Sequence, residues 1–343
     1  MADNLPYLSI APHLKSLRCC GFYQLGSDSS KMKRILHSAY MRLIFFFVLL
    51  YTFQQMMKVY KDRDDLNKVI DTMFLMLTNS DCIYKAIVFW KCADQIEALV
   101  NILTGPLFDQ KKPEHKEFLR EAIRQARLLL RGFNIAAVFT CLLWVLYPVI
   151  LYVQRKPVEF AIWLPFDANL SPQFYFAIFY VWVQTSWLAF TMLYRLSSDF
   201  QKFIRFRFTN LTQNIFGGAV MYLFTISGWI MCTSAYRLVS MKPMSVEFAS
   251  MVMYMFCILV EVFMYCYYGN EVTYESEKLM ESAYALDWLA IPIKHRRALV
   301  IFMERIKRNI DLVAGNLIPI SNSTFVSVVR SSYTFYAFLK NSN

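Results

Sequence analysis

Charged residues and glycine are both scarce in this chain. Only 18% of the 343 residues are charged and nine are glycine, whereas 57% are hydrophobic and 17% are aromatic. A soluble domain is closer to half apolar and a quarter charged. With only eleven prolines as well, the composition excludes a loop-rich or repeat protein. The apolar excess must lie in lipid or in a very large core.

Motifs for catalysis and metal binding are also missing. None of the four histidines has an HExxH spacing, and no glycine-rich phosphate loop follows a strand. The eight cysteines form no CxxC pair, and Cys141, Cys232 and Cys257 lie inside apolar runs, as small buried residues do. We therefore predict that the chain is not an enzyme and holds no cofactor or metal. The few glycines also disfavour a transporter with broken, repeated helices.

Seven apolar runs are present, each near the ~20 residues that a helix needs to cross the hydrocarbon core of a bilayer. They cover residues 36–57, 68–90, 129–153, 172–194, 213–236, 248–268 and 320–339. The runs predict an all-α membrane protein with seven transmembrane helices in a lipid bilayer. No cleavable signal peptide precedes the first run, so we expect the written N-terminus to be that of the mature chain.

The second and seventh runs are less apolar than the others. Asn79, Asp81 and Lys85 interrupt the second run, and the seventh holds Arg330 among several serines. Polar residues inside a membrane helix usually face the bundle interior or water. The seventh run is therefore a candidate for a pore or an interface rather than for a lipid-facing wall.

The net charge of +11 would suggest nucleic acid as a partner of a soluble protein. Here the basic residues fall between the apolar runs, which indicates membrane topology and no nucleic acid, because cytoplasmic loops are rich in Lys and Arg. Twenty-four of them lie before the first run or in the connections 91–131, 194–208 and 275–320, against nine in the alternate connections. The bias predicts a cytoplasmic N-terminus and an extracellular C-terminus. A G-protein-coupled receptor has the opposite orientation, and its DRY and NPxxY motifs are missing.

Two charged amphipathic segments are predicted on the cytoplasmic side. EFLREAIRQARLLLRGF, from Glu117, is basic and runs directly into the third span. WLAIPIKHRRALVIFMERIKRNIDLV, from Trp288, has apolar residues at helical spacing but is too charged to cross lipid. We expect it to form a cytoplasmic helix before the seventh span.

Three glutamates follow the sixth span: Glu271, Glu275 and Glu277. A catalytic pair of carboxylates would flank a substrate and have pKa values pushed apart, but nothing nearby supplies a nucleophile or a metal ligand. We predict instead a helix that emerges into the cytosol, where Lys278, Arg296 and Arg297 are available as ionic partners.

The last 80 residues resemble the insect odorant receptors. YGNEVTYESEKLMESAYALDWLAIPIKHRRALVIFMER is similar to the block that joins the sixth helix of that family to the cytoplasmic part of the seventh. AGNLIPISNSTF and VVRSSYTFYAFLK resemble its final helix, and WLPFDANLSPQFYFAIFYVWVQ, from Trp163, resembles the extracellular loop that enters the fourth helix. The matching residues in the C-terminal part are Gly269, Asn270, Glu271, Glu275, Ser276, Tyr284, Trp288, Pro292, Ala314, Gly315, Pro319, Phe325, Ser332, Tyr333 and Leu339.

Two features depart from the family pattern. Asn316 stands where the family often has a second glycine, so we expect a different local backbone there. The 197–212 connection, SSDFQKFIRFRFTNLT, is shorter than usual. The sister gustatory receptors commonly end in a TY…QF signature. This chain has SYTFYAFLK and no QF, which favours an odorant receptor and leaves a gustatory receptor as the alternative.

The resemblance implies a subunit of a ligand-gated, non-selective cation channel that assembles as a tetramer. A short chain like this one resembles the variable tuning subunit, whose partners are odorant receptor co-receptor subunits, a small volatile odorant, lipid, and permeating monovalent and divalent cations. The implied location is the plasma membrane of a sensory-neuron dendrite. The implied regions are a ligand-binding region (1–273), a cytoplasmic anchor (274–319) and a pore-lining helix (320–343).

A site for a volatile ligand needs apolar and aromatic walls with few polar groups. The family places it between spans two, three, four and six, in their outer halves. The candidate residues are Met73, Phe74, Leu77, Phe139, Trp144, Tyr147, Tyr175, Tyr180, Trp187, Met251, Tyr254 and Met255. Tyr and Trp could bond a heteroatom of the ligand, and Met could adapt to its shape. Aromatic residues at helical spacing also serve packing or an interfacial belt.

The resemblance also implies a pore along the outer part of the final helix. Its narrowest point is expected near Phe338, with Thr334 and Ser342 one turn away on the same face. A hydrophobic constriction gates by dewetting, and polar neighbours hold water once it opens. Arg330 would repel cations, so we expect it to face a partner or to lie below the constriction. Packing within its own subunit is the alternative role for this helix.

Overall fold

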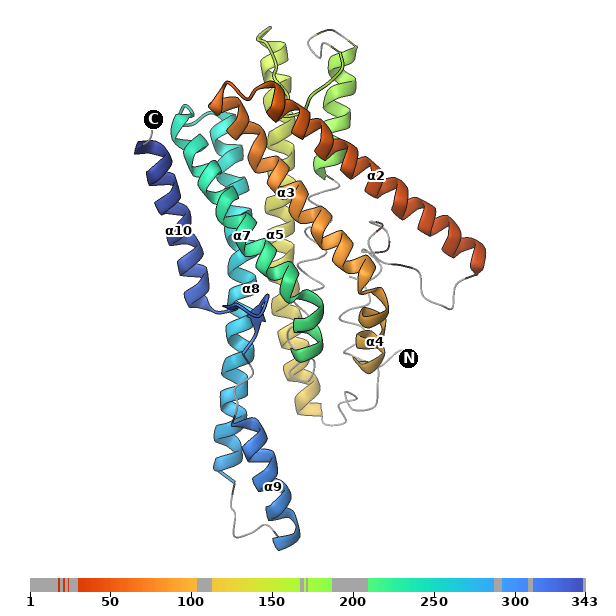
Figure 1. Ribbon diagram of the computed structural model, residues 1–343, viewed down its shortest axis with the longest axis vertical. Coiled ribbons are helices and arrows are strands. Elements are labelled where there is room, and N and C mark those ends of the chain that lie inside the picture. Colours follow the sequence, from red (N-terminus) through yellow and green to blue (C-terminus); the bar gives the residue numbers. More distant parts are fainter. Residues whose placement is uncertain are drawn as a thin grey trace.

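The computed structural model is a bundle of long helices, most of which follow the long axis of the molecule, while the first crosses it obliquely (Figure 1). It describes residues 30–103, 113–166, 172–186, 209–286, 292–307 and 311–341, together with Arg18, Gly21, Gln24 and Leu170. The helices are α2 (Lys31–Lys61), α3 (Leu66–Lys91), α4 (Ala93–Leu103), α5 (Pro113–Val153), α7 (Thr209–Ser240), α8 (Val246–Tyr284), α9 (Ile293–Ile306) and α10 (Asn322–Asn341). Residues 173–186 are also helical. An antiparallel hairpin of β1 (Val313–Ala314) and β2 (Ile318–Pro319) precedes α10.

The predicted apolar runs coincide with helices wherever the structure describes them. The first, second, fifth, sixth and seventh runs match α2, α3, α7, α8 and α10, and the third is the last part of α5. Residues 173–186 are the described part of the fourth run. Within the described helices, four segments are long and apolar enough to cross a membrane: α2, α8, Arg131–Val153 and Gly217–Ser240. Charged and hydroxyl residues lower the hydropathy of α3 and α10.

The two charged segments predicted to be cytoplasmic are helical. The basic segment forms the first part of α5, which continues without a break into the apolar part. α9 lies beside the far part of α8 (Figure 1). Lys278 lies 3.0 Å from Glu275, so one of the predicted ionic partners of the glutamates is confirmed. α4 and the hairpin were not predicted; strands of two residues are too short to show a periodicity.

The hairpin fastens the start of α10 to the bundle. Gly315 and Asn316 have φ values of 57° and 59°, a region that glycine adopts freely and asparagine tolerates. Asn316 therefore keeps a backbone conformation that suits glycine. The N–H of Gly315 donates to the carbonyl oxygen of Gly217 in α7, 2.9 Å away. On the other side, Gly269 of α8 packs so closely on Ile320 that a Cβ atom would lie 2.5 Å from its carbonyl oxygen.

Capping residues set where α3 and α8 begin. The Asp65 carboxylate accepts from the backbone N–H groups of Asn67 and Lys68, and the Ser245 hydroxyl accepts from that of Phe248. These bonds satisfy donors that the first turn of a helix leaves without partners. Both helices therefore start at defined residues at the same end of the bundle (Figure 1).

A polar ladder links α3 to α8; its members are Asp71, Thr78 and Lys85 of α3 and Glu247, Tyr254 and Glu261 of α8. Each set has a spacing of seven residues, close to two helical turns, so each lies along one face of its helix. Lys85 contacts Glu261 at 3.0 Å, and the hydroxyls of Thr78 and Tyr254 are hydrogen-bonded. Arg237 of α7 bridges Asp71 and Glu247. Side chains at three levels thus join two helices that run in the same direction.

The Lys85 level of the polar ladder is the most buried. Lys85 Nζ also lies 2.7 Å from Asp81 Oδ2, and the three side chains are 7% (Lys85), 2% (Asp81) and 5% (Glu261) exposed. Asn79 donates to Gln55 of α2, which is fully buried. Lipid offers no hydrogen bonds, so polar groups in a membrane helix must find partners inside the protein. These polar residues of the second run face the interior of the bundle.

Replacing Lys85 removes the counter-charge of two buried carboxylates. Loss of one partner from a buried ion pair costs ~3–5 kcal/mol. We expect Lys85→Met to lower the melting temperature of the detergent-solubilised protein, measured by size-exclusion chromatography after heating. Lys278→Met is the matched control, because the Lys278–Glu275 pair is exposed and such pairs contribute little. Equal melting temperatures for Lys85→Met and the unchanged chain would contradict a stabilising polar ladder.

Candidate functional site

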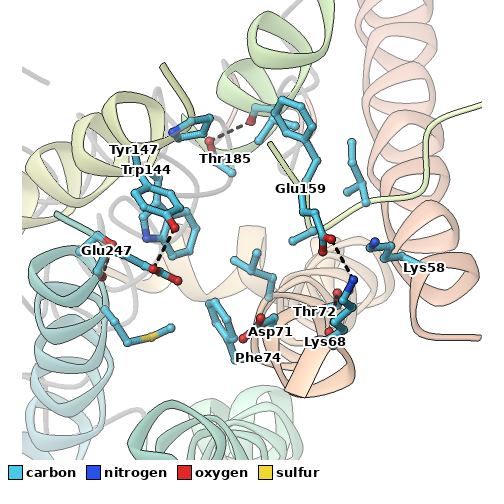
Figure 2. Close-up of a pocket in the computed structure, with 18 of the residues that line it drawn as sticks. Lys58, Lys68, Asp71, Thr72, Phe74, Trp144, Tyr147, Glu159, Thr185 and Glu247 are labelled. Atoms are coloured by element: carbon cyan, nitrogen blue, oxygen red, sulfur yellow. Dashed lines mark hydrogen bonds and ion pairs between the residues drawn. The ribbon is translucent and has the colours of Figure 1, made fainter. Parts of the chain in front are cut away.

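A cavity of about 410 Å³ lies at the end of the bundle where α3 and α8 begin. The cavity is lined by side chains from α2, α3, α5, α7, α8, the helix at 173–186 and the connection 157–162. The volume is in the lower part of the ~300–1,000 Å³ range of small-molecule sites. Figure 2 shows an open centre, with Tyr147 and Glu247 on one side and Lys68 and Glu159 on the other.

Aromatic rings form the deep wall of this cavity. The ring of Phe74 lies 6.1 Å from that of Trp144 and 5.3 Å from that of Tyr254, centre to centre. Trp144 and Tyr254 are 5.4 Å apart. Phe74, Trp144 and the buried Met251 line the cavity, whereas Tyr254 packs behind them. Pro148, one turn beyond Trp144, also lines it and cannot donate to the carbonyl of residue 144, so that turn lacks one helix hydrogen bond.

A second wall of the cavity is polar. Glu247 accepts one hydrogen bond from the Tyr147 hydroxyl at 2.9 Å and one from Arg237 Nη2 at 3.0 Å. Arg237 Nε also pairs with Asp71 Oδ1. All four residues line the cavity, and the Arg237, Asp71 and Glu247 side chains are 23–33% exposed. The first level of the polar ladder therefore belongs to the wall of the cavity.

The connection 157–162 closes the cavity over α3. Phe160 and Ile162 are buried and line it, and Glu159 pairs with Lys68 at 2.8 Å across its edge (Figure 2). Trp163 donates its backbone N–H to the carbonyl oxygen of Gln54 in α2 at 3.2 Å. These contacts hold an irregular segment against two helices.

The candidate ligand residues fall into several groups. Phe74, Trp144, Tyr147 and Met251 line the cavity. Tyr254 and Leu77 pack in the same hydrophobic cluster as Phe74, but neither lines the cavity.

The other candidates lie away from the cavity or outside the described residues. Met73 and Met255 are half-buried and do not line the cavity. Phe139 and Tyr175 do not line it and are exposed over 49% and 61% of their surfaces. Tyr180 donates to Gln54 and packs on Tyr51. Trp187 lies outside the described residues.

Sequence reasoning missed the ionised residues of the lining: Lys58, Lys68, Asp71, Glu159, Arg237 and Glu247. An apolar ligand predicts apolar walls, and these residues stand at the ends of the apolar runs, where charge is ordinarily a marker of topology. A weak signal was present, because Asp71 lies inside the predicted second span.

α10 presents two different faces. Phe325 packs edge-on against Phe263 of α8, and Phe335 stacks on Trp229 of α7, each with ring centres 5.5 Å apart. Thr334 and Phe338 are exposed and lie one turn apart. Arg330 is also exposed, one turn before Thr334. Ser342 lies outside the described residues.

Within the described residues, no group of three or more His, Cys, Asp or Glu side chains could hold a metal ion.

Comparisons with known proteins agree on one family. The family model described as 7tm Odorant receptor matches residues 65–206 and 198–333. Odorant receptor 94a of Drosophila melanogaster is 31% identical over 140 residues, which are 40% of this chain and 36% of that protein. Odorant receptor Or1 of Anopheles gambiae is 20% identical over 350 residues, and the alignment covers 82% of this chain and 83% of that protein. The matched part of this chain spans about a third of the length of the first Drosophila relatives.

The fold is also shared with a solved structure. The insect olfactory receptor OR5 from Machilis hrabei, in complex with eugenol, superposes with a TM-score of 0.87 at 16% identity. The superposition covers 98% of this chain and all of the other. Since the family model matches residues 65–333 in two overlapping segments and the fold of an insect olfactory receptor is reproduced from end to end, this chain belongs to the insect odorant receptors, a family of membrane receptors and not of enzymes.

Proposed function

We propose that the chain is the odorant-binding, tuning subunit of a heterotetrameric, ligand-gated cation channel. A volatile ligand enters the cavity among α3, α5, the helix at 173–186 and α8, and its binding opens a pore lined by α10. Co-receptor subunits complete the channel, which passes monovalent and divalent cations without strong selectivity. The observation that carries this proposal is the cavity of about 410 Å³ with its deep wall of Phe74, Trp144 and Met251.

The helices that line the cavity also support α10, which offers a route from ligand to pore. α7 contributes Arg237 to the lining and stacks Trp229 on Phe335 of α10. α8 contributes Met251 to the lining and packs Phe263 against Phe325 of α10. A ligand can shift an equilibrium only by binding one state more tightly than the other. The bound odorant therefore favours an arrangement of α7 and α8 that moves α10 outward.

In this proposal, the exposed face of α10 lines the pore. Phe338 forms the constriction and excludes water when the channel is closed. Thr334 and Ser342 share its face and hold water when it opens. Arg330 lies two turns below Phe338, beyond the narrowest point.

The proposed topology has seven spans, a cytoplasmic N-terminus and an extracellular C-terminus, in the plasma membrane of a sensory-neuron dendrite. The bias of Lys and Arg toward the N-terminal segment and the connections 91–131, 194–208 and 275–320 supports it. The proposed regions are 1–273 for ligand binding, 274–319 for the cytoplasmic anchor and 320–343 for the pore. Since α8 continues to Tyr284, the first boundary falls within a continuous helix, which can transmit movement from the cavity to the anchor.

Co-expression tests the proposed function. We expect volatile compounds to evoke cation current in cells that express this chain with an odorant receptor co-receptor, and none with the chain alone. Trp144→Ala should raise the half-maximal concentration of an active compound, because it removes a wall of the cavity. Phe139→Ala is the matched control, an exposed aromatic residue on the same helix that lies outside the cavity lining. Silence of the pair with both proteins at the cell surface would contradict the proposal.

Phe338→Ala tests the pore. Removing the constriction should raise basal opening or single-channel conductance in the co-expressed pair, because the closed pore would wet more readily. Tyr333→Ala is the control, because Tyr333 is as exposed as Phe338 (69% and 67%) but lies on another side of α10. If single-channel records of Phe338→Ala show unchanged conductance and basal opening, α10 does not carry the constriction at this residue.

A further inference from the structure

Two carboxylates share a single guanidinium in the wall of the cavity. Arg237 pairs with Asp71 through Nε and with Glu247 through Nη2. Each carboxylate carries one negative charge, so this group of three has a net charge of −1. The Asp71 and Glu247 side chains remain 33% and 27% exposed.

The other ionised groups of the lining are already balanced. Lys68 pairs with Glu159 at 2.8 Å on the opposite side of the cavity (Figure 2). Lys58 pairs with Asp62 of the turn after α2, also at 2.8 Å. Neither lysine is therefore the counter-ion of the Asp71–Arg237–Glu247 group, and the negative charge stays on that wall.

Four hydroxyl groups of the lining offer lone pairs rather than protons. Thr72 donates to the carbonyl oxygen of Lys68, Thr185 to that of Val181, and Ser250 to that of Glu247. The Tyr147 hydroxyl donates to the Glu247 carboxylate. A hydroxyl has one proton and two lone pairs, so each of these groups can still accept a hydrogen bond from a ligand. A ligand that donates hydrogen bonds therefore suits this wall.

Aromatic faces stand beside the carboxylates. Phe74 lies one turn from Asp71 on α3, and Tyr147 is bonded to Glu247. Phe74, Trp144 and Tyr147 all line the cavity. The face of an aromatic ring attracts a cation, and the attraction is strongest for Trp. A positive group placed near Asp71 and Glu247 would meet both carboxylate oxygens and ring faces.

From this arrangement we propose that the ligand is a protonated amine, with its ammonium group against Asp71 and Glu247 and its apolar part over Phe74, Trp144 and Met251. The inference rests on the proposed function and names the ligand class of the same cavity. The ammonium brings the charge of the wall to zero and donates three hydrogen bonds. A carboxylic acid is excluded, because its anion would face two carboxylates across one shared arginine.

Three compounds of similar size test the head group in the co-expressed pair: 2-phenylethylamine, 2-phenylethanol and propylbenzene. Hydrogen bonds to charged groups contribute more than neutral ones, so the half-maximal concentration of the amine should be about tenfold lower than that of the alcohol. The hydrocarbon should be the weakest of the three. An alcohol that equals or exceeds the amine overturns the inference.

Two variants connect the amine to these carboxylates. Asp71→Asn and Glu247→Gln keep the shape of the side chains but remove charge, and each should raise the half-maximal concentration for the amine about tenfold, with a smaller change for the alcohol. Asp64→Asn is the control, because it removes a carboxylate from the α2–α3 turn, outside the lining. Equal shifts for amine and alcohol in both variants would make the residues structural and overturn the inference.

Failure of the inference and failure of the proposed function give different results. If other volatile compounds open the channel but the amine does not, the channel stands and the ammonium site is wrong. If no compound in a broad panel evokes current from the pair at the cell surface, the proposed function fails and the inference fails with it. Surface labelling of each variant separates lost binding from lost folding.

Discussion

The polar ladder between α3 and α8 is the constraint on which the rest of the structure depends. A charged or hydroxyl group in a membrane helix needs a partner inside the protein, because lipid supplies none. Lys85, Thr78 and Asp71 of α3 therefore fix which face of α8 stands opposite. Once that face is fixed, Phe74 and Tyr254 meet Trp144, and the aromatic wall of the cavity follows.

One end of the polar ladder is buried and the other opens into the cavity. At the Lys85 level, two carboxylates and one amine are closed off from solvent and hold the helices together. At the Asp71 level, two carboxylates and one guanidinium stay partly exposed, where a ligand can reach them. Because α7 and α8 link this level to α10, a ligand that alters it acts on helices that support the final one.

The candidate site shows where residue patterns are informative. Phe74, Trp144, Tyr147 and Met251 could be proposed from the sequence because large side chains in the relevant spans are the natural walls of an odorant site. Phe139 and Tyr175 fit the same description yet are exposed and lie outside the cavity lining. An aromatic residue can face either lipid or a pocket. The rotation of each helix about its axis decides which of the two its side chain meets.

The sequence by itself determined the helical membrane fold, the approximate helix boundaries and the family, because long apolar runs and the C-terminal motifs are local properties of the chain. The tertiary structure alone decided which polar residues meet. Thr78 and Lys85 find their partners on α8, 176 residues further along the chain, and Asp71 finds Arg237 on α7, and no local pattern in these segments predicts the pairing. The cavity and its charged wall depend on that pairing, since they exist only where several helix ends come together.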